Sequence, residues 1–137
     1  MSQDWNRDIA QMHEKFGFKE ATHKLDQEKL LAYLKFRFKF LGEELNEGLK
    51  AIENQDAKEI VDALIDLIVV AAGTLDAYGV ESYRAWDEVL FANLEKEVGI
   101  KASRPNPFGL PDLIKPPGWR APNHSDNVGI IPRAFGK

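Results

Sequence analysis

The sequence predicts an all-α fold, an antiparallel helical bundle followed by an irregular, proline-rich C-terminal tail. All seven prolines lie at or after Pro105, so no proline interrupts a helix before that residue. In this front part apolar residues recur at spacings of three and four, without sustained apolar–polar alternation or Asn-Gly and Asp-Gly turns. We therefore expect a helical domain over residues 1–100, with residues 101–137 as a C-terminal extension of the same domain.

Each predicted helix has a local signal at one or both of its ends. The four helices cover about 3–16, 27–54, 57–78 and 81–98. Asp56 can cap the third helix, and Gly17, Gly79 and Gly99 can end the first, third and fourth. Because short loops join them, we expect the helices to pack antiparallel.

The tail has the proline and glycine content of a linker, but it is too apolar for a solvated one. Its large apolar residues are Phe108, Leu110, Leu113, Ile114, Trp119, Ile130, Ile131 and Phe135. We expect the tail to lie along the bundle or along a neighbouring subunit. A disordered tail is the alternative.

The composition argues against several classes of function. The 137 residues include 22 acidic and 18 basic side chains, and the net charge of -4 favours neither nucleic acid nor anionic lipid as a partner. Without cysteine there are no disulfides, thiolate nucleophiles or thiolate-bound metals. The longest apolar run, LIVVAAG at 67–73, is too short to cross a membrane, and the start MSQDWNRD lacks signal-peptide features. We expect a soluble, cytoplasmic protein.

Two of the predicted helices carry acidic strips. The strips consist of Glu43, Glu44 and Glu47 on the second helix and of Glu59, Asp62 and Asp66 on the third. On a helix each strip spans an arc of roughly 60° to 100°. The third helix has aliphatic residues nearly all the way round its acids, which predicts that this helix is mostly buried.

Several carboxylates on a buried helix need a compensating positive charge. Between Glu43 and Tyr83 only Lys50 and Lys58 are basic, so a bound cation is favoured over ion pairs. Carboxylate oxygens, with no cysteine and little histidine nearby, suit Mg²⁺ or Mn²⁺.

The acids also have two other interpretations. They can lie on solvated faces, although the helix that carries Asp62 and Asp66 has little polar surface to spare. A di-iron bundle would need Glu-x-x-His on each of two helices. The only such motif here, Glu20-Ala-Thr-His23, falls in a segment that we expect to be a loop.

The motifs, taken in order, resemble those of the all-α nucleoside triphosphate pyrophosphohydrolases, the MazG-like superfamily. Glu43-Glu44-Leu-Asn-Glu47 followed by Glu59-Ile-Val-Asp62 is similar to the EExxE and ExxD motif of that superfamily. Further segments resemble the MazG-like proteins often carried by bacteriophages: MHEKFGF at 12–18, Arg37, DALIDLIVVAAGTLDAYGV at 62–80, Asn93-Leu-Glu-Lys96 and KPPGWRAPN at 115–123. The resemblance extends over nearly the whole chain.

The resemblance implies that residues 1–100 are a catalytic domain. Its reaction would be Mg²⁺-dependent hydrolysis of a nucleoside triphosphate to the monophosphate and pyrophosphate, with Mn²⁺ as an alternative ion. The implied metal ligands are Glu44, Glu47, Glu59 and Asp62. Glu43 is the candidate for orienting or deprotonating the attacking water, with Glu47 as the alternative. Asp66 is a candidate for binding a further ion or the sugar hydroxyl.

An acidic site also needs basic groups to hold a triphosphate. The candidates for substrate binding are Lys96, Asn93, Arg37 and Lys115 for the phosphates and His13 and Trp119 for the base. Of these, Lys96 and Asn93 rest on the resemblance. The alternatives are a solvated end for each basic side chain and plain packing roles for His13 and Trp119.

We expect a homodimer or homotetramer that acts on deoxynucleoside triphosphates, with a preference for a purine and for dGTP first. Both the oligomer and the substrate follow from the resemblance, which also places a phage-encoded member in the host cytoplasm. One alternative is a non-catalytic helical adaptor whose acids bind metal or a basic partner. Another is a regulatory bundle that binds nucleotide without turnover.

Overall fold

The protein is mostly helical, which confirms the predicted all-α class. The computed structural model describes residues 2–101, 103, 108–109 and 112–137. The chain forms two compact units, one of residues 1–82 and 127–137 and one of residues 83–126. This division differs from the one that we placed at residue 100, because each unit takes residues from both sides of that point.

Three predicted helices are present with nearly the expected ends: α1 (Trp5–Phe16), α3 (Gln27–Glu53) and α4 (Ala57–Ala77). Each begins at an aspartate whose side chain accepts a hydrogen bond from a backbone N–H of the first turn. Asp56, the predicted cap of α4, is one of them. Gly17 ends α1 in the left-handed conformation (φ 72°) that glycine adopts without strain.

The expected loop around residues 20–23 is instead a short helix, α2 (Phe18–His23). This helix follows Gly17 directly. The carbonyl of Gly17 accepts a hydrogen bond from the N–H of Ala21 at 3.0 Å. The hydroxyl of Thr22 is buried and donates to the carbonyl of Phe18 at 2.7 Å. The prediction failed because α2 is only six residues long, too short for its apolar spacing to be recognised.

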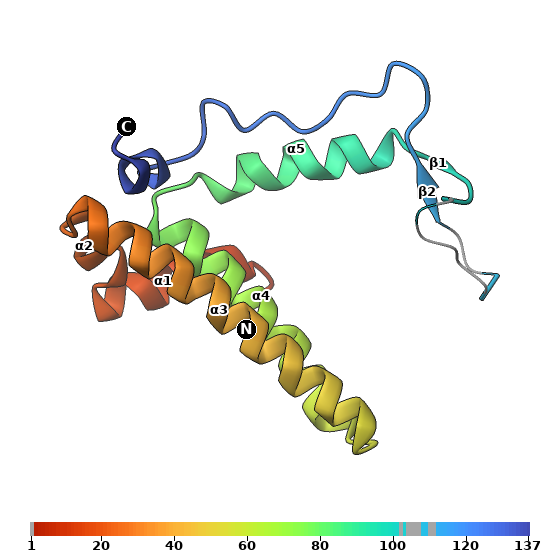
Figure 1. The fold of residues 1–137 in the computed structure, drawn as a ribbon, viewed down its shortest axis with the longest axis horizontal. Coiled ribbons are helices and arrows are strands. Elements are labelled where there is room, and N and C mark those ends of the chain that lie inside the picture. The colour runs from red at the N-terminus through yellow and green to blue at the C-terminus, as the bar shows by residue number, and fades with distance from the viewer. Residues whose placement is uncertain (1, 102, 104–107, 110–111) are drawn as a thin grey trace. The chain divides into compact units, whose positions relative to one another are not determined.

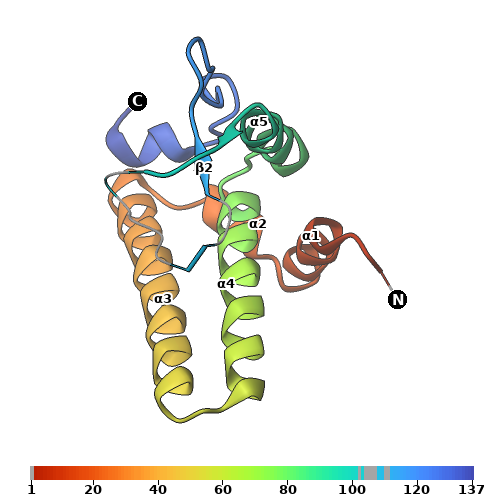
Figure 2. The same cartoon turned by 90° about the vertical axis from the view of Figure 1, so that its right-hand side faces the viewer.

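In the first unit, α3 and α4 form a long antiparallel pair (Figures 1 and 2). The buried residues of α3 are Leu30, Glu44 and Ala51, and those of α4 include Ala63, Val70 and Ala77. Within each helix these positions are seven residues, or twice seven, apart, as in the seam of a coiled coil. α1 packs against α4 as well.

The core of the first unit lies at one end of this pair and includes the end of the chain. Leu30, Tyr78 and Ala134 are completely or almost completely buried there. Ala134 belongs to the 3-10 helix η1 (Ile131–Phe135). The N–H of Ile130 donates to the carbonyl of Tyr78 at 2.8 Å, and a side chain at Gly129 would collide with that carbonyl. Residues 127–137 are therefore packed on the helices.

The second unit contains most of α5 (Ser82–Leu94) and the strands β1 (Glu97–Val98) and β2 (Leu113–Ile114). The helix predicted over 81–98 is thus too long, and a strand lies where we expected none. Glu97 and Val98 leave the helix because they pair with Ile114 and Leu113 in an antiparallel ladder. Such pairing depends on residues distant in sequence.

The segment after β2 runs back beside α5 (Figure 1). The indole N–H of Trp119 donates to the carbonyl of Ala92 at 2.7 Å. Farther along, the backbone N–H of Asn123 donates to the Glu88 carboxylate at 2.9 Å. These bonds hold the segment antiparallel to the helix.

The expectation that α4 is mostly buried is wrong for the single chain. Its exposed large aliphatic residues are Val61, Leu64, Ile65, Ile68 and Leu75, with exposed fractions from 37% to 62%. Leu45, Leu49 and Ile52 of α3 are likewise exposed. The reason is geometric, since α3 covers only one side of α4.

Candidate functional site

Both acidic strips have residues at the contact between α3 and α4. Glu44 of α3 is buried, with 9% of its surface exposed, and it belongs to the same seam as Leu30 and Ala51. Asp66 of α4 is half-buried, whereas Glu47 and Asp62 are exposed. The helices are close here, since a Cβ at Gly48 would lie in contact with the Ala63 side chain, at 3.4 Å.

The electrostatics of Glu44 show which acids lie together. Burial raises the pKa of the Glu44 carboxyl, and the negative charges of Glu47, Asp66 and Asp62 raise this pKa further. One oxygen of Glu44, Oε2, is buried without a hydrogen-bond partner among the described residues. A buried carboxylate oxygen that has no hydrogen-bond partner and lies beside other acids is unfavourable unless a cation or a proton neutralises the group.

The donor atoms of these residues are of the kind that suits Mg²⁺. The donors are hard carboxylate oxygens, and the orphaned Glu44 oxygen provides a position that a cation would satisfy. In the described part of the chain, however, no three carboxylate or histidine groups already surround a single point closely enough to bind an ion. The charge and chemistry fit a divalent cation, and ligation would require these side chains to move closer together.

The remaining two predicted acids are less closely involved. Glu43 and Glu59 are exposed, and neither is among the groups that perturb the pKa of Glu44. Glu59 lies in the first turn of α4, where its backbone N–H donates to the Asp56 cap at 3.2 Å. The structure thus brings together Glu44, Glu47, Asp62 and Asp66.

Arg37, two turns before Glu44 on α3, is bonded to α4. Its Nε donates to the hydroxyl of Thr74 at 2.9 Å, and its Nη2 donates to the carbonyl of Val70 at 3.0 Å. A Cβ at Gly73 would be only 3.0 Å from Arg37 Nη2 and from His13 Nε2. The absence of a side chain at Gly73 therefore lets arginine and histidine meet the α4 backbone.

His13 is buried and connects α1 to α4. Its Nδ1 is 2.9 Å from Asp76 Oδ2, and only 4% of the residue is exposed. Burial lowers the pKa of His13, Asp76 acts to raise it, and the Arg37 charge lowers it. The net effect lowers the pKa of His13 and favours the neutral imidazole.

The neutral state of His13 predicts an acid-sensitive stability. The pKa of this group is below 6.5 in the folded chain and near 6.5 in the unfolded chain, so the unfolded chain takes up the proton first. The stabilisation is complete above pH 6.5 and falls as the pH drops below it, by at most about 1.4 kcal/mol per pH unit. Urea unfolding at several pH values measures this slope. His13→Gln should flatten it and His23→Gln should not; equal slopes in all three proteins would contradict the assignment.

The predicted basic residues of the second unit meet at one aromatic ring. The ammonium groups of Lys96 and Lys115 lie 5.4 Å and 4.9 Å from the centre of the Trp119 ring. Both distances are in the range of cation–π interactions. Asn93 lies close to Lys96 along the chain, and its carbonyl accepts a hydrogen bond from the Lys96 backbone N–H at 3.2 Å.

Sequence reasoning missed Gly73, Thr74 and Asp76. Two signals were available. Asp76 continues the strip of Asp62 and Asp66 on the same helical face, and a glycine inside an apolar helix often marks a close contact. The partner of Asp76 is 63 residues away (76 − 13), at His13, so the pair itself was not visible.

The all-α fold, with acids of two antiparallel helices beside the buried Glu44, is the arrangement that the resemblance to the all-α nucleotide pyrophosphohydrolases leads one to expect. Residues 10–93 match the family described as phosphoribosyl-ATP pyrophosphohydrolase, and the chain belongs to this family within the MazG-like superfamily. Comparisons with curated proteins and with solved structures give no match. Among the described residues, no helix is both long and apolar enough to cross a membrane.

Proposed function

We propose that this protein is a Mg²⁺-dependent hydrolase that cleaves a deoxynucleoside triphosphate to the monophosphate and pyrophosphate. The observation that best supports this proposal is the buried Glu44 carboxylate. One of its oxygens has no hydrogen-bond partner, and Glu47, Asp62 and Asp66 raise its pKa. The family match to residues 10–93 supports pyrophosphohydrolase chemistry on a nucleotide.

Each acid has a proposed role. Glu44, Glu47, Glu59 and Asp62 are the proposed ligands of Mg²⁺ or, alternatively, Mn²⁺. When bound, the ion would polarise phosphate oxygens and neutralise charge that develops on cleavage. Glu43, whose exposed carboxylate is open to water, orients or deprotonates the attacking water, with Glu47 as the alternative base. Asp66 binds a further ion or the sugar hydroxyl.

The substrate contacts are proposed for each unit by itself. In the second unit Asn93, Lys96 and Lys115 are proposed for the phosphates and Trp119 for the base. In the first unit His13 is proposed for the base. Arg37 stays a candidate phosphate ligand, although its hydrogen bonds to Val70 and Thr74 already give it a structural role.

We propose a purine deoxynucleotide, first dGTP, as the preferred substrate. The family description names phosphoribosyl-ATP, which is therefore a second candidate. Both are nucleotides from which a pyrophosphate group can be removed, so a single assay can compare them.

The test is a panel of the common dNTPs, NTPs and phosphoribosyl-ATP, each incubated with the full chain and Mg²⁺. We expect equimolar monophosphate and pyrophosphate, resolved by ion-exchange chromatography. Asp62→Asn should lower the rate by on the order of 100-fold or more while circular dichroism shows an unchanged helical signal. Asp87→Asn, the same chemical change on an exposed residue, should be neutral.

Other products would support other functions. Release of orthophosphate would refute the proposed cleavage to monophosphate and pyrophosphate, and full activity in Asp62→Asn would refute the proposed metal site. Binding of nucleotide with Mg²⁺ but without product would favour a regulatory bundle. No binding of nucleotide and no product would favour a non-catalytic adaptor.

We also propose that the protein is a homodimer or a homotetramer. The support is the pair of exposed aliphatic stripes, Leu45, Leu49 and Ile52 on α3 and Val61, Leu64, Ile65 and Ile68 on α4. Soluble monomers rarely expose contiguous apolar patches of this kind. A second copy offers the same stripes, so a symmetric contact would cover both.

A further inference from the structure

We infer that Arg37 and Thr74 are positioning residues, whose contact fixes the register of α3 against α4. This register brings Glu44 level with Asp62 and Asp66. The inference rests on the proposed function in one respect, because these acids belong to the proposed metal site. It goes further by giving Thr74 a role and by giving Arg37 a role that needs no substrate.

Arg37 occupies a seam position of α3 where an apolar residue would be expected. The buried residues Leu30 and Glu44 are fourteen residues apart (44 − 30), and Arg37 lies halfway between them. In coiled coils a polar residue at one seam position specifies the register, because a shifted alignment leaves it without its partner. Arg37 is half-buried, so the same reasoning applies to the pair of α3 and α4.

The Arg37 guanidinium is bonded to two neighbouring groups of α4. Its Nε donates to the Thr74 hydroxyl at 2.9 Å, and its Nη2 donates to the Val70 carbonyl at 3.0 Å. The Thr74 hydroxyl donates to the same carbonyl at 2.7 Å, which closes a ring of hydrogen bonds. A Cβ at Gly73 would be 3.0 Å from Nη2. Since α4 contains one glycine and one threonine, only this alignment gives Arg37 both the space and the hydroxyl.

The contact sets the level of the acids because the two helices are antiparallel (Figure 2). Counted from it toward the loop that joins the helices, Glu44 lies seven residues along α3 (44 − 37). Asp66 and Asp62 lie four and eight residues back along α4 from Val70 (70 − 66 and 70 − 62). At 1.5 Å per residue these steps are about 10, 6 and 12 Å, so Glu44 comes between the two aspartates. A slip of one turn, about 5.4 Å, would move it out of that interval.

The charge of Arg37 allows a test that depends on sign. Arg37 makes no ion pair with a carboxylate among the residues that the structure describes. If its charge alone mattered, Arg37→Gln would strengthen the binding of a cation by the acids, because like charges repel. If Arg37 fixes the register, the same substitution weakens that binding.

Binding of Mn²⁺ without substrate is the first readout, with free Mn²⁺ followed by electron paramagnetic resonance (EPR). Thr74→Val keeps the shape but removes the hydroxyl, and it should weaken Mn²⁺ binding about tenfold. Thr74→Ser restores the hydroxyl and should stay within about threefold of the wild type. Thr22→Val is the matched control. The Thr22 hydroxyl also donates at 2.7 Å to the carbonyl four residues earlier, but this bond lies within α2. It should leave Mn²⁺ binding unchanged.

Arg37→Gln tests the same contact from α3, even if Thr74→Val fails to fold. We expect it to weaken Mn²⁺ binding as much as Thr74→Val does. The double variant should be no weaker than either single variant, because both substitutions remove one contact. Unchanged or tighter Mn²⁺ binding by Arg37→Gln would overturn the inference, as would additive effects in the double variant.

Spin labels measure the register itself. The protein has no cysteine, so Lys39→Cys and Lys58→Cys place one label on an exposed position of each helix. Labelled protein is diluted into unlabelled protein without metal, and dipolar EPR gives the distance between the labels. This distance should be the same in the wild type and Thr74→Ser, and it should shift or broaden in Thr74→Val by up to about 5.4 Å. Weaker Mn²⁺ binding at an unchanged distance would also overturn the inference.

The inference and the proposed function can fail separately, because neither EPR measurement needs a substrate. Loss of register and of Mn²⁺ binding in Thr74→Val, in a protein that hydrolyses no nucleotide, would support the inference and refute the function. Mg²⁺-dependent hydrolysis by the wild type, with unchanged Mn²⁺ affinity in Thr74→Val, would refute the inference and leave the function standing.

Discussion

Glu44→Gln is expected to make the metal-free protein more stable and, at the same time, to abolish hydrolysis. The carboxylate is buried, its Oε2 lacks a partner, and neighbouring acids raise its pKa, so it destabilises the metal-free fold at neutral pH. The amide has nearly the same shape but carries no charge. We expect a melting temperature a few degrees higher and a rate lower by on the order of 100-fold or more.

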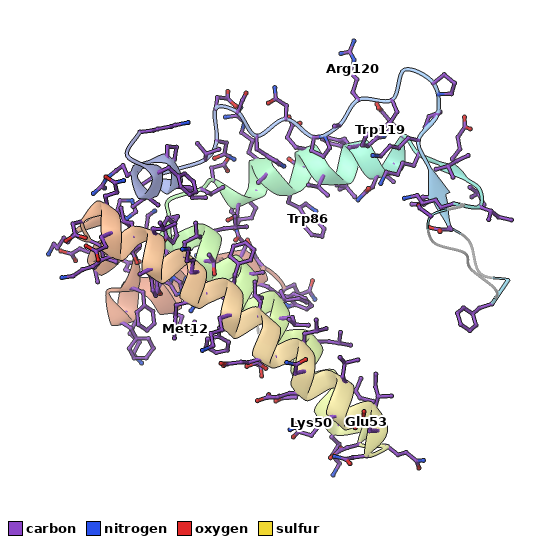
Figure 3. The ribbon with its side chains drawn as sticks, viewed as in Figure 1. Met12, Lys50, Glu53, Trp86, Trp119 and Arg120 are labelled. Carbon is purple, nitrogen blue, oxygen red and sulfur yellow. The ribbon has the colours of Figure 1, made fainter. Side chains whose placement is uncertain are left out.

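The change in stability on adding Mg²⁺ distinguishes the loss of a metal ligand in Glu44→Gln from an ordinary stabilising substitution. An ion that binds only the folded state stabilises the wild type by about 2.7 kcal/mol at 100 times its dissociation constant. Thermal unfolding with and without Mg²⁺ should show this gain in the wild type and its loss in Glu44→Gln. Glu53→Gln, at the far end of α3 in Figure 3, removes the same charge and should keep the gain. A full Mg²⁺ response in Glu44→Gln would exclude this residue as a ligand.

The stability of the metal-free protein should depend on pH in a way that agrees with a destabilising Glu44 carboxylate. Since the pKa of Glu44 is raised above 4.5, the folded chain holds this proton more tightly than the unfolded chain. The stabilising effect of the protonated group is complete below pH 4.5 and is lost as the pH rises through the folded pKa. Glu44→Gln should remove this loss, whereas the acid sensitivity that comes from His13 should remain.

The helices could be predicted because their signals are local. Asp56 lies three residues before the backbone N–H that it caps, and Gly17 ends α1 by its own conformation. Gly99 shows the limit of such signals. We interpreted it as the end of a helix, yet it is glycine for another reason: a Cβ there would be 2.7 Å from the Ile114 side chain. Only the folded ladder shows that contact.

The candidate site was likewise predictable from the sequence only where the signal is local. Helical periodicity predicted that Glu44 and Asp66 lie on strips, because the angle between two residues of one helix is fixed. It did not predict that Glu44 alone would be buried, since that depends on how α3 and α4 cross. The pair of His13 and Asp76 depends on the packing of α1 on α4 and was likewise outside the reach of spacing arguments.

Leu64→Glu is expected to halve the mass of the proposed dimer and to lower its stability. Leu64 is 57% exposed in the single chain and lies in the aliphatic stripe of α4 with Val61 and Ile68. If a second copy covers this stripe, each buried leucine contributes about 1.5–3 kcal/mol, and a symmetric dimer loses that contribution twice. Light scattering should then change from twice the chain mass of 15.5 kDa to a single chain mass.

The size of the stability change caused by Leu64→Glu distinguishes a stripe that is covered by a second copy from one that is exposed to water. On a solvated helix, replacing an exposed leucine by glutamate changes stability little. Under an interface, it leaves an unpaired charge in an apolar contact, and the melting temperature falls in a concentration-dependent way. Lys58→Glu introduces the same side chain on an exposed position outside the stripe and should leave the mass unchanged. A wild type of single chain mass, with Leu64→Glu as stable as Lys58→Glu, would mean that water rather than a second copy covers α4.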